Sequence, residues 1–467
     1  MSGNVYDLLA SGFPEDRMRP CLVLEDQEIS YGALEAGAGR LAALLIDKGV
    51  RPGDRVAVQA PKSPESIMLY LAVLKAGAVY LPLNTAYTEH EVKYFFDDAE
   101  PALFVADAVP LAAEAEGLPP LAAAVARDPG DLAAIVYTSG TTGRSKGAMI
   151  SHRNIAANAQ ALHQAWGFRP GDVLLHALPI FHIHGLFIAL HPALLNGSAM
   201  IWQAKFDADA VLGALPQATV MMGVPTFYTR LLEHPGFTRE RAAHMRLFVC
   251  GSAPLLESTF AAFEARTGQR ILERYGMSEA GVITSNPLDG ARLAGSVGHA
   301  LPGVELRVDA PDGEAGGLEI RGESVFQGYW RMPEKTREDF TADGFFRTGD
   351  VGRRDPDGRV WISGRAKDLI ISGGFNVYPK EIELVLDALP GVGESAVIAV
   401  PHPDFGEAVI AVVAGSGEEA ALIAAARERL AGFKTPKRVF FVDDLPRNAM
   451  GKVQKAALRT QYAKTFG

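Results

Sequence analysis

The stretch that most constrains the fold is Tyr137 to Gly147, which reads YTSGTTGRSKG. An apolar run at residues 132–137 precedes it, and a helical pattern begins near Asn154. A strand that opens into such a loop places backbone N–H groups, hydroxyls and an ammonium group together, which is the chemistry that holds phosphate. The spacing differs from the Walker pattern, because no Gly-Lys-Ser/Thr follows four residues after a glycine. A surface turn is the alternative interpretation.

Composition narrows the classes of protein that this chain can represent. Its 467 residues predict two or three domains. Lys plus Arg is 45 and Asp plus Glu is 55, so a net charge of −10 argues against binding nucleic acid. Two cysteines, Cys21 and Cys250, cannot build a disulfide framework or a zinc cluster. We expect a cytoplasmic protein, because the N-terminus lacks a signal-peptide pattern and the apolar stretch 178–195 contains histidines and prolines.

The order of patterns along the chain predicts an α/β fold. Strands at 27–31, 55–60 and 79–82 alternate with helices at 31–48 and 63–76, which is typical of βαβ units. After residue 300 turn signals crowd together between short strands. We therefore expect a large N-terminal domain at 1–364, made of βαβ-type subdomains and a β-rich subdomain. A linker at 365–368 and a small α+β domain at 369–467 complete the prediction.

Downstream strings follow the phosphate loop in a fixed order. They are Gly251-Ser252-Ala253-Pro254, Arg274-Tyr275-Gly276-Met277-Ser278-Glu279, Thr348-Gly349-Asp350, Arg365, Ser372-Gly373-Gly374-Phe375-Asn376 and Gly451-Lys452. In type, order and spacing they resemble the adenylate-forming enzymes, which include acyl-CoA synthetases, luciferases and the adenylation domains of peptide synthetases. The resemblance covers nearly the whole chain. Each string alone has a structural explanation, such as a turn carboxylate or a surface lysine.

The resemblance implies a binding site for ATP or AMP. It would comprise Thr138, Ser139, Gly140, Thr141, Thr142, Gly143, Lys146, Gly251, Ser252, Ala253, Arg274, Tyr275, Gly276, Met277, Ser278, Asp350, Arg365 and Lys452. Tyr275 would lie against adenine, the Ser278 hydroxyl would meet the α-phosphate, and Asp350 would accept the ribose hydroxyls. Glu279 and Thr138 would hold Mg²⁺. The family's usual threonine is Ser278 here, which keeps the hydroxyl.

The resemblance also implies two successive steps in which a small C-terminal domain moves. Lys452, Glu279, Thr138 and Lys146 would form the catalytic set for the first step, acyl-adenylate formation. Ser372, Gly373, Gly374 and Phe375 would line the CoA tunnel used in the second, and Lys367 would be the hinge. The resemblance further implies that Lys452 is a target of a lysine acetyltransferase, and acetylation would remove its charge.

The acid is predicted from pocket residues and from a closer resemblance. His182, Arg230, Arg274, Ser252 and Met277 are the candidate acyl-binding residues. Two arginines suit a substrate with a second carboxylate, although Arg230 could equally be a helix-surface residue. A metal site at His182 and His184 lacks a third ligand nearby.

The strings ALPIFHIHGLF, GVPTFYTRLL, MRLFVCGSAPLL and FVDDLPRNAMGKVQK resemble malonyl-CoA synthetases, which implies malonate, ATP and CoA as substrates. Residues 280–283 depart from that group, so methylmalonate or another short acid stays open. So do three other readings: an enzyme that loads a carrier protein, a luciferase-like oxidase and a non-catalytic AMP-binding protein.

Overall fold

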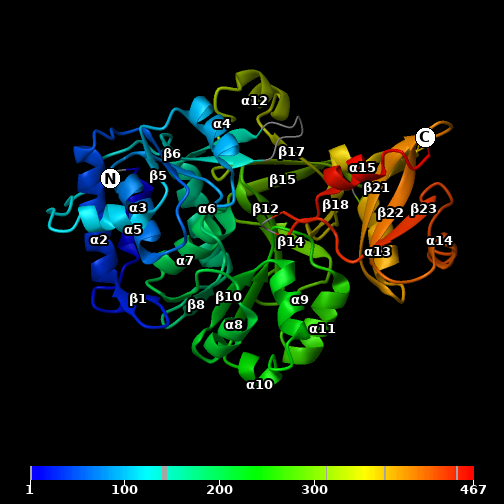
Figure 1. Ribbon diagram of the computed structural model, residues 1–467, viewed down its shortest axis with the longest axis horizontal. Coiled ribbons are helices and arrows are strands. Elements are labelled where there is room, and N and C mark those ends of the chain that lie inside the picture. The colour runs from blue at the N-terminus through cyan, green and yellow to red at the C-terminus, as the bar shows by residue number, and fades with distance from the viewer. Residues whose placement is uncertain (1–2, 139–144, 312, 373–374, 449–450, 467) are drawn as a thin grey trace.

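The computed structural model describes residues 3–138, 145–311, 313–372, 375–448 and 451–466. It confirms an α/β architecture with a large N-terminal part and a small C-terminal domain, which lies at one side of the molecule (Figure 1). The described helices include none that is both long and apolar enough to cross a membrane.

The first sheet of the N-terminal part contains the predicted βαβ unit. Its strands are, in spatial order, β5 (Leu103–Val105), β3 (Arg55–Val58), β4 (Val79–Pro82), β6 (Leu132–Thr138) and β7 (Lys146–Ser151). Helix α3 (Pro64–Lys75) connects the parallel strands β3 and β4 and starts at a Ser63 cap. Strand β7 runs antiparallel to β6. The phosphate loop therefore connects two strands, and the helix expected after it, α6 (His152–Ala165), begins only beyond β7.

The second sheet has thirteen strands and crosses the whole N-terminal part. One half is mainly parallel and contains β2 (Glu28–Ser30), β1 (Pro20–Val23), β9 (Ala199–Trp202), β8 (Val173–His176), β10 (Val220–Gly223), β11 (Leu247–Cys250) and β12 (Leu272–Met277). The other half is antiparallel and contains β13 (Gly281–Ser285), β14 (Ser296–Ala300), β18 (Val360–Arg365), β17 (Phe346–Arg354), β16 (Gly316–Gly322) and β15 (Val304–Asp309). The predicted β-rich part thus continues the same sheet.

Helices pack around these sheets and fix a large hydrophobic core. They are α1 (Val5–Ser11), α2 (Tyr31–Asp47), α3, α4 (Glu89–Ala99), α5 (Ala108–Glu114), α6, α7 (Leu190–Leu195), α8 (Ala208–Ala214), α9 (Pro225–Glu233), α10 (Arg239–Ala242), α11 (Glu257–Thr267) and α12 (Pro333–Asp339). Short turns of other types are the π-helix η1 (His184–Ala189) and the 3₁₀ helices η2 (Leu215–Gln217) and η3 (Ala366–Asp368).

The C-terminal domain has its own sheet and core. Its strands are β20 (Phe375–Val377), β19 (Ile370–Ser372), β22 (Gly406–Gly415), β21 (Val392–His402) and β23 (Arg438–Val442), with helices α13 (Pro379–Asp387), α14 (Glu419–Arg427) and α15 (Lys455–Tyr462). Helix η3 lies between β18 of the large sheet and β19 of this one. Rotation at this connection stays a prediction.

One glycine at the centre of the long sheet generates a stability prediction. Gly298 has φ +79°, and a Cβ there would lie 2.0 Å from the Ser285 carbonyl oxygen on β13. Gly298→Ala should destabilise the N-terminal domain by about 3 kcal/mol, from backbone strain and overpacking together. Gly303→Ala is the matched control, because Gly303 has φ +80° with open space around it, and should cost only about 1 kcal/mol. Equal shifts of the calorimetric Tm would contradict the steric argument.

Candidate active site

The predicted site residues gather where the parallel strands β10, β11 and β12 end. Carboxyl ends of neighbouring parallel strands are the usual position of ligand sites in α/β folds. Gly251 and Ser252 follow β11, while Arg274 to Met277 lie on β12 and Ser278 and Glu279 on the turn after it. Ser252 has φ +72°, an uncommon conformation for a residue with a side chain. At Gly276 a Cβ would lie 2.1 Å from the Gly281 carbonyl oxygen, so this position needs glycine.

A group of polar residues forms around Glu279. The Tyr329 hydroxyl donates to Glu279 Oε1 at 3.1 Å, and the Thr138 hydroxyl lies 3.5 Å from the same oxygen. Lys146 lies over the Tyr329 ring, 4.1 Å from its centroid. Burial raises the pKa of Glu279 and lowers that of Lys146. The structure therefore brings Thr138, Lys146 and Glu279 together, as the sequence predicted, while Ser139, Gly140, Thr141, Thr142 and Gly143 lie outside the described residues.

These residues fit the predicted magnesium ion. Mg²⁺ is usually held by one or two carboxylates together with substrate phosphates, and it needs few ligands from the protein itself. Glu279 is buried, and its described neighbours are hydroxyls and cations that do not neutralise it by close ion pairing. No group of three or more potential metal-binding side chains exists among the described residues.

A second group connects the nucleotide segment to the start of the C-terminal domain. The Tyr275 hydroxyl donates to Asp350 Oδ2 at 2.5 Å, and Arg365 Nε lies 2.7 Å from Asp350 Oδ1. The Thr348 hydroxyl accepts from the Asp350 backbone N–H. Asp350 is buried, so its carboxylate is fixed by these donors. Tyr275, Asp350 and Arg365 are thus neighbours, as predicted, although they come from three distant segments.

The C-terminal domain brings Lys452 to the same place. A Cβ on Gly451 would lie 3.1 Å from the Thr226 hydroxyl on α9, so the Lys452 loop lies against the N-terminal domain. The Lys452 side chain reaches solvent, yet nearby protein atoms partly desolvate its ammonium. This desolvation, with the charges of Arg365 and Lys367, lowers its pKa to about 8.

The candidate CoA segment lies in the C-terminal sheet. Ser372 is buried, whereas Phe375 is 55% exposed and stacks on Phe433 at 4.6 Å between ring centroids. Gly373 and Gly374 lie outside the described residues. The CoA contacts stay a prediction.

Arg274, a candidate acyl-binding residue, is a buried cation with no ion-pair partner among the described residues. Arg274 is 4% exposed, and its Nε and Nη2 atoms have no hydrogen-bond partner among the described residues. The guanidinium lies over Gly251, where a Cβ would come within 2.4 Å of Nε. Burial lowers the pKa of Arg274 to about 10, so the group stays charged at neutral pH. An unpaired buried charge is costly, and an anionic ligand would compensate for it.

Two neutral histidines lie close to Arg274. Burial and the charge of Arg274 lower the pKa of His182 to about 4 and that of His184 well below its usual value. His182 Nδ1 accepts from the His184 backbone N–H at 3.1 Å, so its proton is on Nε2, for which the described residues provide no acceptor. His184 Nδ1 lies 3.1 Å from the Ser252 hydroxyl. The structure therefore places His182, Ser252 and Arg274 near one another.

Arg230 differs from Arg274 in its exposure to solvent. It is exposed on α9, two residues beyond the buried Tyr228. This position favours the helix-surface interpretation, and its contact with the acid stays a prediction. Sequence reasoning missed Tyr329 and Asp339, which both contact Lys146. The sequence carried no signal for them, since only the fold brings these residues to β7.

The chain belongs to the AMP-binding enzyme family. The family's main domain matches residues 12–330, and the AMP-binding enzyme C-terminal domain matches residues 381–452. Together with its relatives, this defines an AMP-forming CoA ligase.

The similar proteins include several ligases of small acids. The chain is 32% identical to a malonate–CoA ligase of Arabidopsis thaliana, over 98% of this chain and 89% of that protein. It is 36% identical to a sulfoacetate–CoA ligase of Cupriavidus necator, over 94% of each. The ATP-bound structure of MatB from Rhodopseudomonas palustris is 49% identical over the full length of both chains, with a TM-score of 0.97.

The structure of MatB without ligand matches less closely, with a TM-score of 0.86 at 50% identity. This chain therefore superposes better on the ATP-bound MatB structure than on the structure without ligand.

The lowered pKa of Lys452 predicts a pH dependence for acyl-adenylate formation. The charged form is present below a pKa of about 8 and is lost above it. kcat/KM for adenylation should therefore be flat at neutral pH and fall by roughly tenfold per unit above that pKa. Lys452→Ala should remove adenylation across the whole range. Thioester formation from supplied acyl-adenylate should lack this alkaline fall, and the same fall in both steps would contradict the assignment.

The hinge yields a second prediction. Arg365 pairs with Asp350 of the N-terminal domain, and Asp368 pairs with Arg459 of α15 at 2.6 Å, so the chain is anchored on both sides of Lys367. Lys367→Pro fixes φ near −65°, which suits the 3₁₀ turn seen here but blocks a change of this angle. Thioester formation should therefore fall more than adenylation in separate half-reaction assays. Matching losses would place the hinge at another residue.

Proposed function

We propose that this protein is a malonate–CoA ligase, which converts malonate, ATP and CoA to malonyl-CoA, AMP and pyrophosphate. The observation that carries the proposal is the buried, unpaired guanidinium of Arg274 beside His182 and His184. In a monocarboxylic acid the single carboxylate is the reacting group, so no second anionic group is available to pair with Arg274. Malonate has a second carboxylate for it, and relatives include ligases named for malonate.

In the first step one malonate carboxylate oxygen attacks the α-phosphorus of ATP, the bond to the bridging oxygen breaks, and pyrophosphate leaves. Lys452 offers an ammonium to the attacking carboxylate and the α-phosphate, where negative charge concentrates. Lys146 and Thr138 serve the departing pyrophosphate. Mg²⁺, when bound at Glu279, supplies further positive charge to the phosphates.

In the second step the CoA thiol, losing its proton, attacks the acyl carbon and AMP leaves. We propose that Asp350 and Arg365 hold the ribose throughout, while the C-terminal domain turns at Lys367 to present Ser372 to Phe375 to CoA. Acetylation of Lys452 would block only the first step, and it stays a prediction.

A second candidate is a ligase for another short acid with two acidic groups. The relative from Cupriavidus necator is named for sulfoacetate, whose sulfonate would also pair with Arg274. Methylmalonate fits the same logic. Purified protein with ATP, Mg²⁺ and a panel of malonate, methylmalonate, succinate, sulfoacetate and acetate, with and without CoA, tests both. AMP and thioester formed best from malonate support the proposal, and preference for acetate refutes it. Turnover only with a carrier protein would instead indicate a loading enzyme.

Arg274 generates a prediction about selectivity. Arg274→Met removes the partner of the second carboxylate, and losing one partner of a buried charge pair costs about 2–5 kcal/mol, or roughly 30- to 5,000-fold. kcat/KM should fall far more for malonate than for acetate. Arg230→Met tests the other candidate arginine in the same assay, and an unchanged malonate-to-acetate ratio would identify Arg230 as a helix-surface residue. If Arg230→Met changes the ratio and Arg274→Met does not, the second carboxylate lies at α9.

A further inference from the structure

Helix α12 ends on an acidic residue that faces the phosphate loop. Asp339 Oδ2 lies 3.8 Å from the Lys146 ammonium, and Asp339 Oδ1 lies 2.8 Å from that of Lys335. The side chains of Lys146 and Asp339 are 12% and 20% exposed, so solvent screens their interaction only in part. The Asp339 carboxylate thus forms ion pairs with the ammonium groups of both Lys146 and Lys335 at the edge of the site.

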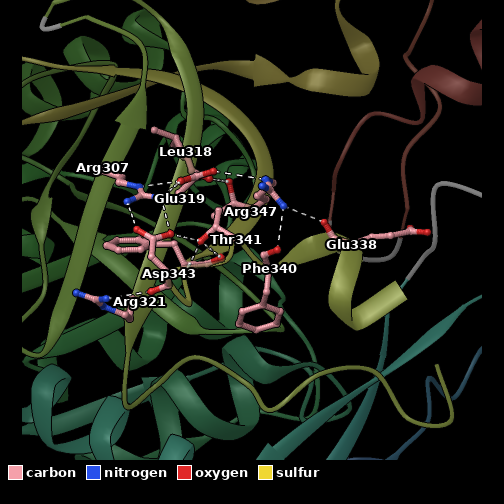
Figure 2. Close-up of polar contacts among 11 residues, drawn as sticks. Arg307, Leu318, Glu319, Arg321, Glu338, Phe340, Thr341, Asp343 and Arg347 are labelled. Atoms are coloured by element: carbon pink, nitrogen blue, oxygen red, sulfur yellow. Dashed lines mark hydrogen bonds and ion pairs between the residues drawn. The ribbon is translucent and has the colours of Figure 1, made fainter. Parts of the chain in front are cut away.

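The end of α12 is fixed by a single arginine. Arg347 Nη1 on β17 donates to the carbonyl oxygens of Glu338 and Phe340, both at 3.0 Å (Figure 2). These two carbonyls flank Asp339 in the chain. Cationic side chains commonly bind the free carbonyls at helix C-termini. The clamp therefore fixes the backbone on both sides of Asp339.

Arg347 is in turn held by the antiparallel half of the long sheet. Glu319 on β16, which is buried, lies 3.5 Å from Arg347 and 2.7 Å from Arg307 on β15. Arg307 also pairs with Asp343 at 2.6 Å, as Figure 2 shows. A network of this kind restricts each side chain more than a single surface pair would. Asp339 consequently has a rigid support, although it lies near the molecular surface.

We propose that Asp339 is a positioning residue for Lys146. A lysine side chain has many rotamers, and an ion pair with a fixed carboxylate restricts them before ATP binds. The separation of 3.8 Å, together with the ring of Tyr329, holds the ammonium in place without a close contact that phosphate would have to break. This inference rests on the proposed role of Lys146 toward the departing pyrophosphate.

The test uses the full chain and separates the two steps. Asp339→Asn should slow acid-dependent exchange of pyrophosphate into ATP about tenfold, because misplacing Lys146 weakens interactions with the leaving group. Thioester formation from supplied malonyl-adenylate should stay unchanged, since no pyrophosphate takes part. Glu338→Gln is the matched control, because Glu338 is the preceding acid on α12 and its carboxylate pairs with Lys335 and with no other described residue. It should exchange at the wild-type rate.

A double-mutant cycle identifies Lys146 as the residue through which Asp339 acts. In a Lys146→Gln background, adding Asp339→Asn should change the exchange rate by less than about twofold. An undiminished tenfold loss in that background, an equal loss in Glu338→Gln, or a parallel loss of thioester formation would each overturn the proposal. A wild-type protein that exchanges pyrophosphate with none of the acids would refute the proposed function instead.

Discussion

The Asp350 carboxylate connects the parts of this protein that must cooperate. It accepts from the Tyr275 hydroxyl and pairs with Arg365, so it joins β12, β17 and the residue that leads into the C-terminal domain. Its charge also acts on the ammonium of Lys452. Because buried carboxylates need several donors to remain charged, this connection is costly to break. The nucleotide segment and the interdomain connection are therefore coupled through one side chain.

The site combines two kinds of charge environment. Around Glu279 and Lys146, opposite charges lie near one another, an arrangement that suits a phosphate ligand with bound Mg²⁺. Around Arg274 the protein supplies one cation, neutral histidines and no described carboxylate partner. This second environment is the basis of the proposed substrate, an acid that carries a second anionic group.

The sequence predicts much of this arrangement, and its failures have physical causes. The βαβ unit around α3 and the elements of the C-terminal domain follow from periodicity and caps such as Ser63. The continuity of the long sheet could not be predicted, since pairing between β12 and β13 or β14 and β18 leaves no local pattern. The sequence did not distinguish the exposure of the two candidate arginines. Tyr228 and Leu231 take the buried face of α9, which leaves Arg230 outside, whereas Arg274 lies inside a central strand.

The order of strands in the two sheets also determines how the chain can fold as it is synthesised. All strands of the five-stranded sheet lie within residues 55–151, so this sheet can close as soon as that segment is complete. Strand β1 pairs with the nearby β2, but its other edge must wait longer, because its parallel partner there is β9 at Ala199–Trp202. Contacts between such distant segments form slowly. Cys21 on β1, fully buried in the finished protein, is therefore covered by the long sheet only after β9 has been synthesised.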